Sequence, residues 1–192
     1  MTMWLSGDKA ADRLLADRPI ALVIGMVLDQ QVPFERAFSA PYELQQRLGG
    51  TLTAKKVAAL DPAVLLEAFT RYRSLHRFPG AMAERVQRMC QVVVDEWGGK
   101  PERLWETASS GEELVQRLKS LPGFGEQKAK IFAALLGKQL ACRPKGWREA
   151  TAPYGEAGTT ISVADISSAA TLAKVRAHKR ESKKAAKQAS AT

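Results

Sequence analysis

The chain is poor in cysteine and has no long apolar segment. Two cysteines in 192 residues, Cys90 and Cys142, are too few for a disulfide framework, a four-cysteine zinc site or a cysteine-ligated iron–sulfur cluster. No apolar run approaches the roughly 18 residues that a membrane-spanning helix needs. Residues 1–17 lack the apolar core of a signal peptide. We therefore set aside the secreted, membrane-spanning and metal-cluster classes and expect a cytoplasmic protein.

The chain also lacks convincing strand patterns and internal repeats, whereas apolar residues recur at helical spacing. We predict an all-α fold, as one compact domain or two small lobes that share a core. Pro33 should end or kink the second helix, and residues 143–160 should form loops and short turns. The predicted helices cover residues 8–17, 19–32, 41–48, 63–70, 81–97, a short segment around 104–105, 112–121, 126–136, and one or two helices within 162–179.

The predicted helix that begins at Pro19 is apolar on every side. Ile20, Ile24 and Val27 repeat at helical spacing, and Leu22 and Met26 make the opposite side apolar as well. Helices of this kind are usually buried at the centre of a domain.

Basic residues outnumber acidic ones by nine, and most of this excess lies near the C-terminus. Residues 171–192 carry seven lysines and arginines against one acid, Glu181. Residues 183–192 offer nothing to bury, so we expect 181–192 to be a basic, disordered tail. Such a tail either keeps the protein in solution or adds salt-dependent attraction to phosphates, as in a nucleoid-associated binder.

The most informative segment is a predicted helical hairpin at about residues 112–136. Its turn, Leu121-Pro122-Gly123-Phe124-Gly125, removes side chains at two positions and leads into a helix N-terminus. Unpaired amides and the positive end of the helix dipole can bind an anion there, unless the turn is only a helical connector.

This turn resembles the helix-hairpin-helix motif of the HhH-GPD superfamily of base excision DNA glycosylases. The segment Ile24–Val32 is similar to the central helix of that family, and Ala81–Trp97 to the helix before the hairpin. The resemblance spans about residues 15–140 and implies a two-lobe helical domain, which we place at residues 1–180. It also implies a monomer that binds double-stranded DNA and flips a base.

The resemblance assigns DNA contacts to the hairpin and to one glutamine. Gln31 matches a side chain that fills the space left by a flipped base, although it could simply cap the helix end before Pro33. A monovalent cation, Na⁺ or K⁺, would bind the carbonyl oxygens of Lys119, Leu121 and Phe124. The residues expected to contact DNA are Gly123, Gly125, Gln127, Lys128, Lys130 and Gln31.

The chain departs from the family at the residues that carry its chemistry. Lys145 stands at the spacing of the catalytic aspartate, and Gln127 stands where bifunctional members carry a lysine nucleophile. The iron–sulfur ligands are also missing. These features imply a monofunctional glycosylase without a hairpin-lysine lyase step. The alternative is a catalytically inactive DNA-binding or damage-recognition module with the same fold.

A carboxylate is the usual means of stabilising the positive charge that builds on the sugar. Asp29 is the best substitute by position, because it ends the apolar central helix and could face a cleft. Asp165 and Glu35 are weaker candidates, since Asp165 could be a helix cap. Lys145 could act as an amine nucleophile or simply contact phosphate.

The sequence leaves the roles of several other side chains open. Trp147 and Tyr154 could stack on a flipped base or belong to the core. His76 and His178 lack the neighbours of a metal or catalytic pair. We expect Arg71, Arg73, His76 and Arg77 to form a basic surface patch.

Overall fold

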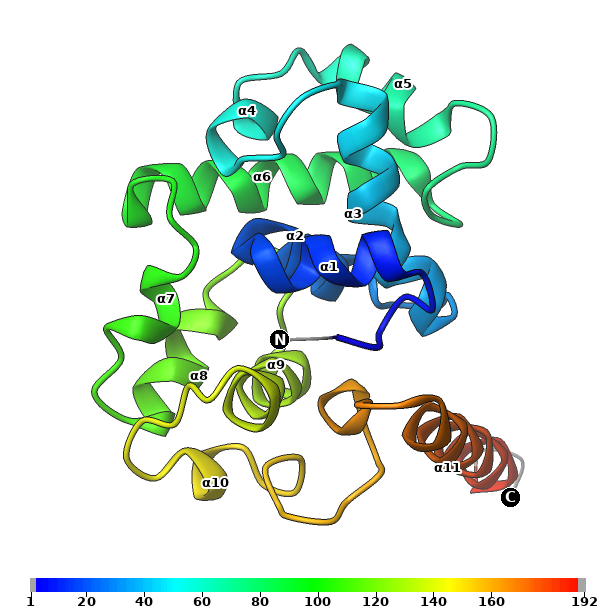
Figure 1. Cartoon of the computed structure of the whole chain (residues 1–192), viewed down its shortest axis with the longest axis vertical. Helices are drawn as coiled ribbons and strands as arrows, with labels where there is room; N and C mark the ends of the chain where they lie inside the picture. The colour runs from blue at the N-terminus through cyan, green and yellow to red at the C-terminus, as the bar shows by residue number, and fades with distance from the viewer. Residues whose placement is uncertain (1–2, 190–192) are drawn as a thin grey trace.

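The computed structural model describes residues 3–189, and within them the chain forms helices and loops but no β-strand (Figure 1). This confirms the predicted all-α fold. The helices are α1 (Lys9–Asp17), α2 (Pro19–Leu28), α3 (Phe34–Leu48), α4 (Ala54–Ala58), α5 (Pro62–Thr70), α6 (Pro79–Trp97), α7 (Arg103–Glu106), α8 (Gly111–Lys119), α9 (Glu126–Gln139), α10 (Trp147–Ala150), the 3₁₀ helix η1 (Val163–Asp165) and α11 (Ala169–Ala189).

Helix α2 lies at the centre of the molecule, as its all-round apolar sequence predicts. Every residue from Ile20 to Leu28 is buried. Helices α1, α3 and α6 pack against α2, and α4 and α5 pack against the other side of α6 (Figure 1). Helices α8, α10 and η1 pack against α9. The two groups share one continuous apolar core.

Helix α3 begins earlier than the sequence pattern indicates. A helix was expected only from Pro41, whereas α3 starts at Phe34, directly after Pro33, and contains Pro41 in its interior. Proline lacks an amide hydrogen and so removes one helical hydrogen bond. Burial of Phe34 and Phe38 in the shared core outweighs that loss. Helix α4 was not expected at all.

The C-terminal helix is longer than expected. Helix α11 continues to Ala189, beyond the predicted end near Lys179 and through most of the segment expected to be a disordered tail. Residues 190–192 of that segment lie outside the described residues. Across residues 3–189 no helix combines the length and the apolar character needed to cross a bilayer.

Gly25 allows α2 and α3 to approach closely. A Cβ atom at this position would lie 2.7 Å from Cδ1 of the Phe38 ring, so the ring would have to shift. We expect Gly25→Ala to lower the free energy of unfolding by about 1–2 kcal/mol, because overpacking outweighs the gain in helix propensity. Urea denaturation followed by circular dichroism measures this change.

Gly80 of α6 provides the matched control. A Cβ atom there would meet Leu66 Cδ1 at 3.8 Å, an ordinary contact. Gly80→Ala should leave the free energy of unfolding unchanged or raise it by up to about 1 kcal/mol. Equal effects of the two substitutions would contradict the packing argument.

Candidate functional site

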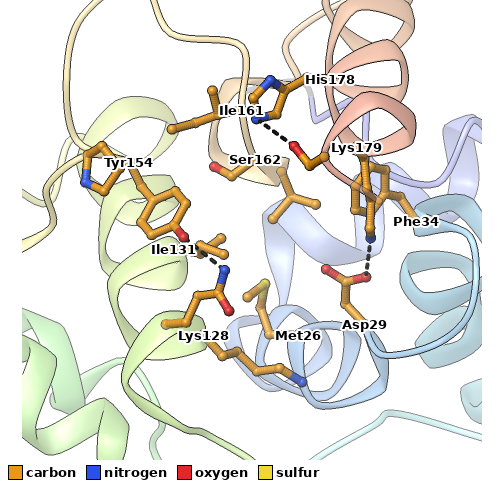
Figure 2. A pocket seen from close by; sticks show the side chains of 14 residues that line it. Met26, Asp29, Phe34, Lys128, Ile131, Tyr154, Ile161, Ser162, His178 and Lys179 are labelled. Atoms are coloured by element: carbon orange, nitrogen blue, oxygen red, sulfur yellow. Dashed lines mark hydrogen bonds and ion pairs between the residues drawn. The ribbon is translucent and has the colours of Figure 1, made fainter. Parts of the chain in front are cut away.

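A cavity of about 620 Å³ lies where α2, α9 and α11 meet, next to the loop that precedes η1 (Figure 2). Met26, Phe34, Ile131 and Tyr154 give it apolar and aromatic walls. Its polar side chains come from segments far apart in the sequence. They are Asp29, Gln127, Lys128, Ser162, His178, Lys179 and Ser182.

Asp29 follows the last residue of α2 and faces this cavity (Figure 2). Its side chain is only 13% exposed, and the ammonium nitrogen of Lys179 lies 3.9 Å from Oδ1. Oδ1 accepts no hydrogen bond from any described residue. Burial raises the pKa of the carboxyl group, while the charges of Lys179 and Lys128 act in the opposite direction. The structure therefore places Asp29 where the sequence predicts, and its catalytic role stays a prediction.

Lys128 turns into the protein and does not extend over the hairpin surface, where a DNA contact was expected. Its Nζ donates to the carbonyl oxygen of Val27, at 3.0 Å, and so joins α9 to the end of α2. Burial lowers the pKa of Lys128 to about 8, an effect that the negative charge of Asp29 opposes. Successive residues of an α-helix point about 100° apart, and the packing of α9 turns residue 128 towards α2.

Gln127 also contributes to the cavity. Its Nε2 donates to the hydroxyl oxygen of Tyr154, which lies in the loop of residues 143–160, at 2.9 Å. Tyr154 therefore lines the cavity, where a residue that stacks on a flipped base would have to lie. Trp147 belongs to the core: it is buried, with its indole ring against Gly137 of α9.

The hairpin turn leaves the first amides of α9 open. Gly125 is the N-cap of α9 and offers no side chain to accept hydrogen bonds from them. A Cβ atom at Gly125 would meet nothing within 4 Å. Gly123 has φ +91°, and a Cβ atom there would lie 2.8 Å from Cδ of Arg85. The Arg85 guanidinium group itself donates to Gln30 Oε1 at 3.2 Å. The open amides at the start of α9 are a feature that favours the binding of an anion.

Three other hairpin side chains form ion pairs with one another. Lys130 lies 3.0 Å from Glu126, and Glu126 also lies 3.5 Å from Lys119. These two lysines lower the pKa of Glu126. The acid at the start of α9 is therefore balanced by neighbouring cations.

Asp165 and Glu35 lie outside the cavity. The Asp165 side chain is 3% exposed, and it accepts hydrogen bonds from Lys138 Nζ at 2.6 Å and from the amides of Ile161 and Ser162. Asp165 therefore caps the helix η1, which was the alternative to a catalytic role. Glu35 forms an ion pair with Arg176 of α11.

His76 is buried and does not belong to the surface patch in which it was expected. Its Nε2 lies 2.9 Å from the carbonyl oxygen of Gln30, and its Nδ1 accepts a hydrogen bond from the amide of Phe78. The ring is therefore neutral, with its hydrogen on Nε2. Burial lowers its pKa, and the charges of Lys128 and Arg36 add to that effect. His76 ties the loop of residues 71–78 to the segment that follows α2.

Tyr72 was not singled out in the sequence analysis as a candidate for contact with a ligand. Its position between Arg71 and Arg73 was a signal, because an aromatic residue between two basic ones is typical of a nucleic-acid-binding surface. Tyr72 is 88% exposed and has φ +37°. Arg36 and Arg47 donate to the carbonyl oxygen of Arg73, at 3.2 and 2.8 Å, and so hold the loop. Gln31, in the adjacent segment, is also exposed and has φ +57°.

Comparison with known proteins gives one match. A family model described as HhH-GPD superfamily base excision DNA repair protein matches residues 24–192. A search of curated proteins and a search of solved structures return no significant match.

The buried His76 makes stability depend on pH. The unfolded chain takes up a proton on this residue near pH 6.5, whereas the folded protein does so only at lower pH. Stability is therefore lost as the pH falls from 7 towards 5. We expect His76→Gln to show a smaller loss of unfolding free energy over this range, as measured by urea denaturation. An unchanged pH dependence would contradict the assignment of a neutral His76.

Proposed function

The chain belongs to the HhH-GPD superfamily of base excision DNA repair proteins, and we propose that it is a monofunctional DNA glycosylase. It flips a damaged or mismatched base out of duplex DNA and hydrolyses the N-glycosidic bond. The observation that carries this proposal is the buried Asp29 carboxylate, which faces a cavity next to the hairpin.

The hairpin binds the DNA backbone in this proposal. The open amides at the start of α9 receive a phosphate. The carbonyl oxygens of Lys119, Leu121 and Phe124 would hold a monovalent cation, which adds positive charge beside that phosphate. The Leu121 carbonyl already accepts the Phe124 amide at 3.0 Å, which leaves one of its lone pairs for the ion.

Two exposed side chains stabilise the DNA from which the base has left. Gln31 offers hydrogen bonds to the unpaired partner base, and Tyr72 offers an aromatic face to the stack. His76 contacts the carbonyl oxygen of Gln30, next to Gln31, and Arg36 donates to the carbonyl oxygen of Arg73, next to Tyr72. These contacts hold the two loops that carry Gln31 and Tyr72. The rigid loops lower the cost of flipping, which is a few kcal/mol.

The flipped nucleotide enters the cavity between the apolar walls and Asp29. The carboxylate stabilises positive charge on the sugar and accepts a proton from the attacking water. The water oxygen bonds to C1′ as the bond from C1′ to the base nitrogen breaks. The departing base takes a proton from solvent. Lys128, whose Nζ donates to the Val27 carbonyl oxygen, takes no part in these steps.

One observation favours the inactive DNA-binding module as a second candidate. Lys145 stands at the family's aspartate position and is exposed, and it does not line the cavity. Asp165, the other candidate acid, is fully engaged in hydrogen bonds. If Asp29 does not act as the catalytic carboxylate, neither of these residues can replace it, and the chain would be the inactive module.

Base release from a panel of duplexes tests the enzymatic proposal. The duplexes carry uracil, hypoxanthine, alkylated purines, oxidised guanine or mismatches, and free base is measured by chromatography. We expect release from at least one duplex and a loss of at least about 100-fold in Asp29→Asn, as for a group that acts directly in the transition state. Asp95→Asn, which makes the same change at an exposed aspartate of α6 outside the cavity, should retain activity.

Two outcomes of this experiment would contradict the proposal. Binding to an abasic-site analogue without release of any base would favour the inactive module. Borohydride trapping of a covalent complex with abasic DNA that is lost in Lys128→Gln would show a lyase in place of a monofunctional enzyme.

Gly125→Asp separates the stability of the hairpin from DNA binding. The position has room for a side chain, has extended backbone and caps α9, so aspartate should leave stability equal or higher. Its carboxylate would occupy the amides and repel phosphate. We expect at least tenfold weaker binding to duplex DNA by fluorescence anisotropy, about 1.4 kcal/mol. Gly125→Ala is the control, and unchanged affinity in Gly125→Asp would remove the hairpin from the interface.

A further inference from the structure

Helix α11 forms one side of the candidate cavity. Val175 anchors this helix in the core, and Arg176 pairs with Glu35 at the start of α3. The next turn places His178 and Lys179 over the cavity, on the side opposite Met26 (Figure 2).

An aromatic ring and a carboxylate lie beside the ammonium group of Lys179. Its Nζ lies 3.9 Å from the centroid of the Phe34 ring and 3.9 Å from Asp29 Oδ1. The attraction between a cation and an aromatic face is directional, so the ring restricts where the ammonium group can lie. The position on Phe34 keeps the charge of Lys179 beside the carboxylate.

A buried carboxylate needs such a neighbour to remain ionised. Burial favours the protonated form of Asp29, and a protonated acid can neither accept a proton from water nor stabilise a cation. Two cations oppose this effect, Lys128 from α9 and Lys179 from α11. Of these, Lys128 also donates to the Val27 carbonyl.

Among the side chains that the structure describes, the other charged or titratable groups near Asp29 have partners elsewhere. Arg176 pairs with Glu35, and His178 lies 3.4 Å from the hydroxyl group of Ser182. His76, behind the segment that follows α2, is neutral. Lys179 is therefore the cation whose position in the cavity is set by the aromatic ring and the carboxylate together.

We propose that Lys179 is the positioning residue of the Asp29 carboxylate, so that the C-terminal helix completes the candidate active centre. This inference deepens the proposed function and rests on it for its kinetic consequence. Its electrostatic consequence is independent of activity. Removal of the ammonium group should make Asp29 take up its proton at higher pH and free the carboxylate to rotate.

Carbon-13 NMR of aspartate-labelled protein tests the electrostatic part directly. In Lys179→Met the titration midpoint of Asp29 should rise by about one pH unit, the size expected for loss of an adjacent charge. Lys179→Arg should restore the midpoint, because it keeps the cation. Lys174→Met removes an exposed lysine from the same helix and should leave the midpoint unchanged.

Phe34→Leu provides a second variant that keeps both charged groups. Loss of the ring should release Lys179 and raise the Asp29 midpoint in the same direction. A midpoint that is unchanged in both Lys179→Met and Phe34→Leu would overturn the proposal. So would an equal rise in the Lys174→Met control.

The pH dependence of single-turnover base release tests the kinetic part. The acid limb of the rate profile should move to higher pH in Lys179→Met and return in Lys179→Arg. Faster release in Lys179→Met at every pH would show that the side chain blocks the cavity and would overturn the proposal. If the unaltered protein releases no base, the proposed function fails, while the NMR titration still decides the role of Lys179.

Discussion

Burial of a carboxylate at the C-terminal end of an apolar helix is the constraint around which the cavity is organised. Asp29 loses hydration there, and the negative end of the α2 dipole adds to the cost. Only nearby cations can offset these effects. They come from α9 and α11, which follow α2 by a long stretch of sequence. The fold therefore has to bring α2, α9 and α11 together around a single buried charge.

Lys128 shows how this closure links two functions. It lies three residues after Gly125, the N-cap of α9, yet its amine reaches the last turn of α2. The exposed start of α9 is available to an anion, while the inner side of the same turn holds the cavity together. Gln127 contributes to this second role through Tyr154. One helical turn thus serves both the hairpin and the cavity.

Helical periodicity was sufficient to predict the fold class, the burial of α2 and the hairpin. It extended α2 to residue 32, however, whereas this helix ends at Leu28 and Pro33 is the N-cap of α3. The direction of a side chain depends on packing, so the inward turn of Lys128 and the burial of His76 could not be predicted. Lys179 approaches Asp29 only through the docking of α11, and no local pattern records that contact. The early start of α3 was missed because Pro41 lowers helix propensity locally, whereas the contacts that compensate for it are distant.

The short segment of α9 between Gly125 and Lys128 acts as a rigid spacer. An α-helix rises 1.5 Å per residue, so the two positions are separated by about 4.5 Å along the axis. A helix resists stretching, and this separation cannot adjust to the molecule that is bound. In the proposed function, a phosphate held at the start of α9 would therefore stand at a constant distance from the turn that carries Lys128. The nucleotide attached to that phosphate would then enter the cavity with a defined offset.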